Sequence, residues 1–172
     1  MEGRRTSDVT EGQQHDVSNE AGLLSFYEVA FDDVYRSAAR LTWGDRSVAE
    51  DLVQEAFVRL VRSVRVGGVT TVGIGWMITT VRHIHIDGLR SKERENLRLR
   101  AASTASSRPP SSREIPSMLD GLADRERAAL ILRYVDDLSV ADVADLMGDS
   151  VRATESLLRR AKRKVRYTRS AS

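Results

Sequence analysis

The sequence predicts an all-α protein made of two small helical domains joined by a flexible linker. In several separate segments, apolar residues recur at steps of three and four, the spacing that places them on one face of a helix. All three prolines lie within residues 101–117, a segment rich in Ser and Ala and typical of an extended linker. A chain of 172 residues has room for two small domains, each with a modest core.

The overall composition excludes several classes of protein. Hydrophobic residues make up 41% and charged residues 30%, and no apolar run approaches the roughly 20 residues that span a bilayer. No apolar stretch follows Arg4 and Arg5, so the N-terminus does not have the form of a secretory signal. Without cysteine the chain forms neither disulfides nor thiolate metal sites. We therefore expect a cytoplasmic protein with no membrane contact of its own.

The first predicted helix follows a polar N-terminal segment. Residues 1–22 are polar and show no periodicity, so we expect a disordered tail. A helical pattern begins near Leu23 and ends before the Trp-Gly-Asp-Arg segment at 43–46. Its apolar positions are Phe26, Tyr27, Ala30, Phe31, Val34, Tyr35, Ala38 and Leu41.

A second helix is predicted to open at a capping box. Residues 47–50 have the S-x-x-E form in which a serine side chain and a glutamate satisfy the first amides of a helix. Apolar residues then recur at helical spacing as far as Val64. Residues 65–75 contain four glycines among β-branched residues, a composition that favours an exposed, mobile loop.

A third helix is predicted from Trp76 to about Arg94. Its apolar and basic residues separate onto different faces of the helix, which would complete the first domain. The inward positions are Met77, Ile78, Val81, Ile84, His85 and Leu89, and the basic edge consists of Arg82, Arg90, Lys92 and Arg94.

Beyond the linker, the sequence has the layout of a helix-turn-helix. One helix is expected over residues 122–135, and Ser139 is placed to cap a short second helix that ends at Gly148. Ser150 then caps a last helix. A short helix, a glycine-containing turn and a basic helix is the arrangement that places a recognition helix on DNA. The inward face of the last helix is predicted to consist of Ala153, Thr154, Leu157, Leu158 and Ala161.

The charge distribution supports DNA binding by the last helix, although the net charge of the chain is only +2. Residues 119–150 carry eight acidic against three basic side chains, a net charge of −5, whereas residues 151–169 carry one against eight, a net charge of +7. Cations on a recognition helix displace the counterions of DNA phosphates. We expect Arg152, Ala153, Glu155 and Ser156 to approach base edges, and Arg159, Arg160 and Arg163 to contact phosphates.

No pattern in the sequence indicates catalysis, a metal or a cofactor. On a helix His83 and His85 point about 200° apart, so they do not share one metal. The glycine-rich segment lacks the Lys-Ser/Thr pair of a nucleotide-binding loop, and the acidic residues have no catalytic spacing. We expect a protein that is not an enzyme.

Three segments together resemble the extracytoplasmic-function (ECF) group of the sigma-70 family of RNA polymerase initiation factors. Residues 49–57, AEDLVQEAF, resemble the polymerase-binding helix of that group. Residues 76–90 resemble its promoter-melting helix, and residues 122–148 resemble its fourth conserved region. By this resemblance, residues 23–98 form a region 2-like domain and residues 118–168 a region 4-like domain. The linker spans 99–117, and 169–172 form a short tail.

The resemblance also implies partners and roles. Core RNA polymerase and promoter DNA are the expected partners, together with an inhibitory anti-sigma factor. The segment before Trp76 would capture a flipped base, and the helix at 150–164 would read the minus-thirty-five element. Polymerase binding is expected at Asp51, Gln54 and Glu55, and minus-ten recognition at Arg82, His83, Asp87, Arg90 and Lys92.

The sequence departs from the usual pattern of the group at several positions. His83 stands where Asn is commoner, Met77 where Leu is commoner, and Glu155 where many relatives carry a basic residue. The segment before Trp76 also lacks the acidic and aromatic residues common there, which leaves the base pocket unassigned. A regulator that binds an operator alone as a dimer is the alternative function, and polymerase dependence separates the two.

Overall fold

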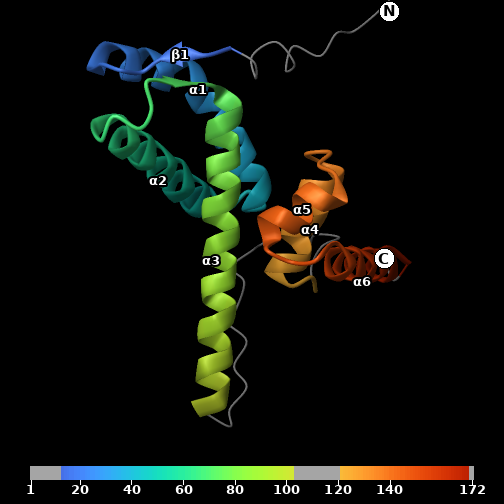
Figure 1. Ribbon diagram of the computed structural model, residues 1–172. Coiled ribbons are helices and arrows are strands. Elements are labelled where there is room, and N and C mark those ends of the chain that lie inside the picture. The colour runs from blue at the N-terminus through green and yellow to red at the C-terminus, as the bar shows by residue number, and fades with distance from the viewer. Residues whose placement is uncertain (1–12, 103–120, 171–172) are drawn as a thin grey trace, which may run out of the picture. The chain divides into compact units, whose positions relative to one another are not determined.

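A computed structural model describes residues 13–102 and 121–170, with side chains described for 13–99 and 121–166. These residues form six helices and two short strands, which confirms the predicted all-α class (Figure 1). The chain divides into two compact units, residues 1–85 and 86–172, with the boundary inside the third helix. The elements are β1 (His15–Asp16), α1 (Glu20–Leu41), α2 (Arg46–Arg65), β2 (Thr71–Val72), α3 (Ile74–Ala102), α4 (Asp124–Tyr134), α5 (Val140–Met147) and α6 (Val151–Ser170).

The core of the first unit lies where α1 packs against α2. The predicted apolar stripes supply it, because residues three and four apart share one helix face. Helix α3 begins two residues before the predicted Trp76. Of its predicted inward residues, Met77, Ile78 and Val81 are buried, whereas Ile84, His85 and Leu89 are half-buried. The other buried side chains of these helices include Phe26, Ala30, Val34, Ala38, Leu52, Val53, Ala56 and Leu60.

The predicted capping box at the start of α2 is wrong. The helix begins at Arg46, and the carboxylate of Asp45 accepts a hydrogen bond from the Val48 amide at 3.2 Å. Ser47 lies inside the first turn and is exposed. The chain leaves α1 through Trp43 and Gly44, which both have positive φ. Asp45 follows with the extended backbone geometry of an N-cap residue.

The predicted disordered tail is wrong for residues 13–22. β1 pairs antiparallel with β2, and α1 begins at Glu20 with Asn19 as its cap. Val17 is fully buried, so this segment adds an apolar side chain to the core that its polar composition concealed. The remaining residues of the predicted tail, 1–12, lie outside the described part of the chain.

The segment before α3 is only partly the exposed loop that its glycines predict. Residues 66–68 are exposed, but Val72 and Ile74 are 2% and 1% exposed. Pairing with β1 satisfies the backbone of β2, which allows this short stretch to be buried.

Helix α3 is longer than predicted. It continues to Ala102, through the first residues of the predicted linker at 99–117. Residues 92–102 are Lys, Glu, Arg, Leu, Asn and Ala with no Pro or Gly, and most of these are strong helix formers. The other predicted linker residues, 103–117, lie outside the described ranges.

The helix-turn-helix is confirmed in its elements and caps. The Ser139 hydroxyl accepts a hydrogen bond from the Asp142 amide, and the Asp142 carboxylate accepts one from the Ser139 amide. Gly148 closes α5 in the left-handed conformation, at φ 58°. Ser150 caps α6 through the Ala153 amide at 3.2 Å.

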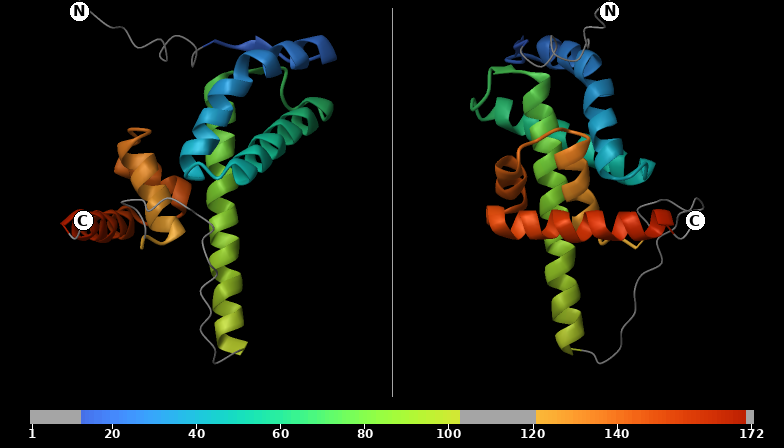
Figure 2. Two further views of the ribbon diagram at one scale, coloured as in Figure 1. Left: turned by 180° about the vertical axis from the view of Figure 1, so that it is seen from behind. Right: turned by 90° about the vertical axis from the view of Figure 1, so that its right-hand side faces the viewer.

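Helix α6 packs against both α4 and α5 and extends beyond them towards the C-terminus (Figure 2). Its buried face includes Thr154, Leu157, Leu158 and Ala161, as predicted, but Ala153 is exposed. Across the described residues, no helix combines the length and apolar character needed to cross a membrane.

Candidate nucleic-acid interface

The exposed face of α6 carries a stripe of arginines. Arg152, Arg159 and Arg163 are all exposed and occupy positions i, i+7 and i+11, which lie on one side of a helix. Ser156 lies on the same stripe and is half-buried. The opposite face packs on α4 and α5, so the fold fixes the direction in which the stripe faces. Arg160 is also exposed, on the flank of the stripe.

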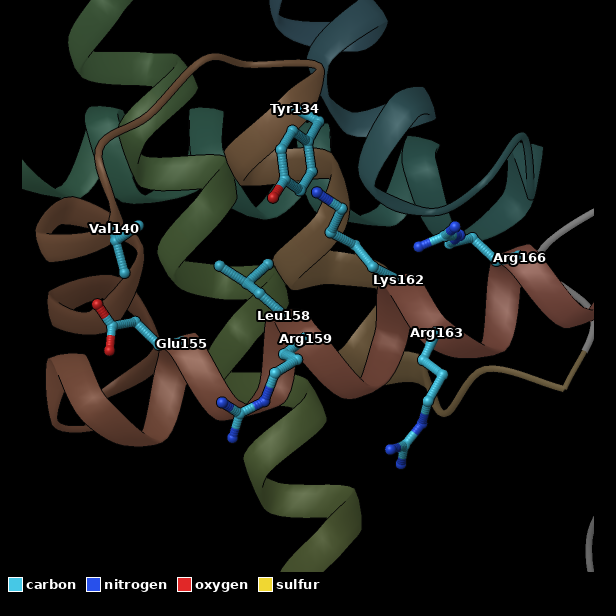
Figure 3. A pocket seen from close by; sticks show the side chains of 8 residues that line it. All are labelled: Tyr134, Val140, Glu155, Leu158, Arg159, Lys162, Arg163 and Arg166. Atoms are coloured by element: carbon cyan, nitrogen blue, oxygen red, sulfur yellow. The ribbon is translucent and has the colours of Figure 1, made fainter.

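A groove of about 820 Å³ lies between α6 and the end of α4 (Figure 3). The ammonium group of Lys162 lies 4.9 Å from the ring centroid of Tyr134, a cation–π contact. In Figure 3, Arg159 and Arg163 point away from this tyrosine. The groove is lined by Tyr134, Val140, Glu155, Leu158, Arg159, Lys162, Arg163 and Arg166. Lys162 therefore serves partly to pack α6 on α4, whereas the arginine stripe is presented outward.

The residues predicted to bind polymerase lie on one polar face of α2. Asp51 and Gln54 are exposed, and Glu55 is half-buried. The Arg59 guanidinium donates a hydrogen bond of 2.8 Å to Glu55, which lowers the pKa of this carboxyl below its ordinary value. Val58, 41% exposed, adds an apolar side chain between these polar ones.

The residues predicted to contact the minus-ten element lie along α3. His83, Asp87 and Lys92 are exposed, and Arg82 and Arg90 are half-buried. Arg90 lies 3.3 Å from Asp87 one turn earlier, and its guanidinium also donates hydrogen bonds to the Met147 and Leu146 carbonyls at the end of α5. Among the described residues, no three His, Cys, Asp or Glu side chains are grouped as metal ligands would be.

Two family models match the chain, one in its N-terminal part and one in its C-terminal part. The model described as "Sigma-70 region 2" matches residues 26–95, and the one described as "Sigma-70, region 4" matches residues 112–165. The chain belongs to the sigma-70 family, in its ECF group. Together the two matches cover more than half of the sequence, and each overlaps one of the two predicted domains.

Several curated proteins are similar to this sigma factor along most of their length. The Probable RNA polymerase sigma-C factor of Mycobacterium bovis is 27% identical over 157 residues, 84% of this chain and 81% of the relative. The ECF RNA polymerase sigma factor SigM of Bacillus subtilis is 29% identical over 149 residues, 81% of this chain and 90% of the relative.

One solved structure has the same fold. It is the sigma factor RpoE in complex with the anti-sigma factor NepR from Bartonella quintana, with a TM-score of 0.52 and 19% sequence identity. The match covers 86% of this chain and 96% of that one.

In this sigma factor, one basic residue of α6 has a structural role that the sequence alone does not show. The ammonium group of Lys164 lies 2.6 Å from the carboxylate of Glu126, whose side chain is only 8% exposed. Glu126 also accepts a hydrogen bond from the Ala123 amide at the start of α4. Burial alone would raise the pKa of Glu126, but these hydrogen bonds outweigh it and the pKa lies below its ordinary value. The pair joins α4 to α6.

Trp76 is a second residue that sequence reasoning left without a role. It lies in the first turn of α3, where its amide donates a hydrogen bond to the Gly73 carbonyl, and it is 41% exposed. The sequence could have indicated a role for Trp76, because it is a large aromatic residue at the start of a helix with basic residues. Bases of single-stranded DNA stack on such rings.

Proposed function

We propose that this sigma factor contacts core RNA polymerase through α2, the minus-ten element through α3 and the segment before it, and the minus-thirty-five element through α6. The observation that carries the proposal is the arginine stripe, Arg152, Arg159 and Arg163, on the exposed face of a helix-turn-helix. The match of residues 112–165 to sigma-70 region 4 supports a function of the stripe in promoter recognition.

Helix α2 is proposed to bind the polymerase through Asp51, Gln54 and Glu55. Val58 adds apolar area to the same face, which suits a protein interface better than a purely charged surface does. Arg59 holds the Glu55 carboxylate in place, so this side chain loses less freedom on binding.

Helix α3 is proposed to hold the opened minus-ten strand. Arg82, Arg90 and Lys92 supply positive charge for the backbone, and His83 and Asp87 lie close to them as hydrogen-bonding side chains. Extruding a base from duplex DNA costs about a few kcal/mol. We propose that the segment 66–73 and the ring of Trp76 offset part of that cost by holding the extruded base.

Helix α6 is proposed to read the upstream element in the major groove. Its N-terminal residues Arg152, Ala153, Glu155 and Ser156 are the base-reading set, because recognition helices present their first turns to the groove. Arg159, Arg160 and Arg163 follow on the exposed side and are proposed to contact phosphates.

We infer that the protein works by binding rather than catalysis, and that it acts in the cytoplasm, where promoter DNA and polymerase are found. We also propose an inhibitory anti-sigma partner that covers the polymerase-binding faces of one or both domains. The complex of the structurally similar RpoE with NepR supports this proposal.

In vitro transcription tests the proposal directly. Purified chain and core polymerase are incubated with fragmented genomic DNA, and the start sites are mapped. We expect initiation only when both proteins are present, with two shared sequence elements upstream of the start sites. Tight, symmetric binding of the chain alone to these sites would instead identify an operator-binding dimer.

A further inference from the structure

The N-terminal strand β1 is built onto the segment that leads into α3. His15 pairs with Val72 and Asp16 with Thr71, and the Val17 amide donates a hydrogen bond of 2.9 Å to the Thr70 carbonyl. The views of Figures 1 and 2 show β1 beside this segment at one end of α1. The contacts tie the middle of the segment to a part of the chain some fifty residues earlier.

Side chains of β1 anchor it to the core of the first unit. Val17 is fully buried, and the His15 ring lies 5.2 Å from the ring of Phe26 in α1. Asp16 accepts a hydrogen bond from the Ser18 amide at 2.9 Å, and Asn19 caps α1 immediately afterwards. Both ends of the strand are therefore fixed.

Gly22 in α1 leaves room for the backbone of β1. A methyl group at this position would collide with the backbone carbonyl oxygen of Asp16. Gly22 is the third residue of α1, and the absence of a side chain there lets the Asp16 carbonyl approach the helix closely.

On the other side of β2, Gly73 and Ile74 are buried and the chain enters α3 directly. Only residues 66–71 are left at the surface of the segment, with Val69 half-buried among them. At the start of this stretch the Gly67 and Gly68 amides donate hydrogen bonds to the end of α2, and at its end β1 holds the chain just before it enters α3.

We propose that residues 15–17 are a positioning element for base capture, and that Gly22 permits their docking. This inference rests on the proposed function of segment 66–73. A segment already held in one path loses less conformational freedom when it closes around a base than a free glycine-rich loop would. Docking of β1 therefore strengthens the hold on the extruded base without any contact between β1 and DNA.

The test compares how tightly the holoenzyme binds single-stranded DNA that has the captured base and DNA that lacks it. Core polymerase carrying this sigma factor is bound to a single-stranded oligonucleotide of the minus-ten non-template sequence, taken from the mapped start sites. A series of oligonucleotides carries one abasic position each. For the wild type we expect about tenfold weaker binding when the captured base is missing, the order of magnitude of one stacked base.

Two variants remove the positioning in different ways. Gly22→Ala displaces β1 while favouring α1, and Val17→Thr keeps the side-chain shape but buries a hydroxyl where the strand packs. In both we expect the abasic discrimination to fall at least threefold while the affinity for core polymerase is unchanged. The exposed Ser25→Ala in α1 is the matched control and should discriminate as the wild type does.

The outcomes separate this inference from the function on which it rests. If the wild type shows no abasic discrimination at any position, segment 66–73 captures no base and both ideas are wrong. If the wild type discriminates and the variants do so equally, base capture stands and the role of β1 is refuted. Hydrogen exchange at residues 15–17 and 70–72 confirms that docking was lost while α1 and α2 kept their protection. If Gly22→Ala does not fold, Val17→Thr decides.

Discussion

The carboxylate of Glu126 shows how a basic helix can divide its charges between structure and DNA. Lys164 contacts a side chain that is almost completely buried, so its charge is used within the domain. The arginines of the stripe lie on another face of the same helix. Within the described residues, no buried carboxylate pairs with them as Glu126 pairs with Lys164. A count of basic residues in the sequence could not make this distinction.

Glu126→Gln is expected to destabilise the second unit by about 1 to 2 kcal/mol at neutral pH, since it removes the charge that Lys164 contacts at a buried site. The pKa of Glu126 is lower in the folded chain than in the unfolded chain. Its stabilisation is therefore present above the ordinary carboxyl pKa and is lost as the pH falls towards the lowered value. Denaturation of both proteins from pH 7 to pH 4 should show the difference shrinking.

The control for this experiment is Asp145→Asn, which removes the same charge from an exposed position on α5. It should change stability little at any pH in that range. A Glu126→Gln difference that stayed constant down to pH 4 would show that the ion pair is not its cause.

The cap of α2 gives a second residue-level prediction. Asp45→Ala should lower the free energy of unfolding by about 1 kcal/mol, because the Val48 amide loses its acceptor. Ser47→Ala should have almost no effect, since Ser47 lies within the first turn. Chemical denaturation of the two variants decides between the cap in the structure and the one the sequence suggested, and equal losses would contradict both.

Individual caps were predictable where the surrounding turn is regular. Ser139, Gly148 and Ser150 were assigned correctly because each follows or precedes a well-marked apolar pattern. The sequence does not predict the Asp45 cap, because Ser47 and Glu50 match a capping box by spacing alone. The backbone geometry of Trp43, a non-glycine residue with positive φ, decides where α2 starts, and no composition rule anticipates it.

At the scale of elements, the sequence predicts the helices but not the short strand β1. The apolar stripes of α1, α2 and α6 are long enough for their periodicity to dominate. β1 has only two residues, and its stability comes from pairing with a segment some fifty residues away. Local sequence patterns do not show such long-range pairing, so the sequence alone predicts a disordered tail at residues 15–17.

The arginine stripe of α6 makes a prediction at this scale. Arg159→Ala and Arg163→Ala should each weaken promoter binding by the holoenzyme and lower the slope of log affinity against log salt by about one. Titrations at several salt concentrations measure this slope. Arg36→Ala, an exposed arginine of α1, is the charge-matched control and should leave the slope unchanged.

Two results would contradict phosphate contacts by the arginine stripe. Unchanged slopes for both α6 variants would show that these arginines are a solvated surface and do not contact phosphates. Equal changes for Arg36→Ala and Arg163→Ala would show an effect of net charge only.

At the scale of the whole molecule, the site residues divide between the two matched regions. The candidate polymerase and minus-ten residues lie within residues 26–95, and the candidate minus-thirty-five residues lie within 112–165. The family and this division could be predicted from three short motifs, because each motif combines several residue types at fixed spacing. Which individual side chains touch DNA or polymerase could not, since those contacts exist only in the assembled complex.

This division predicts two kinds of defect that respond differently to mass action. Gln54→Ala in α2 should lower the affinity for core polymerase by roughly tenfold, so transcription falls at low polymerase and recovers when polymerase is raised. Arg163→Ala in α6 weakens promoter binding after the holoenzyme has formed, so added polymerase should not restore it. Transcription across a polymerase titration measures both, with the exposed Glu28→Gln of α1 as control. Recovery of both variants would mean that α6 also acts in polymerase binding, and recovery of neither would remove α2 from that role.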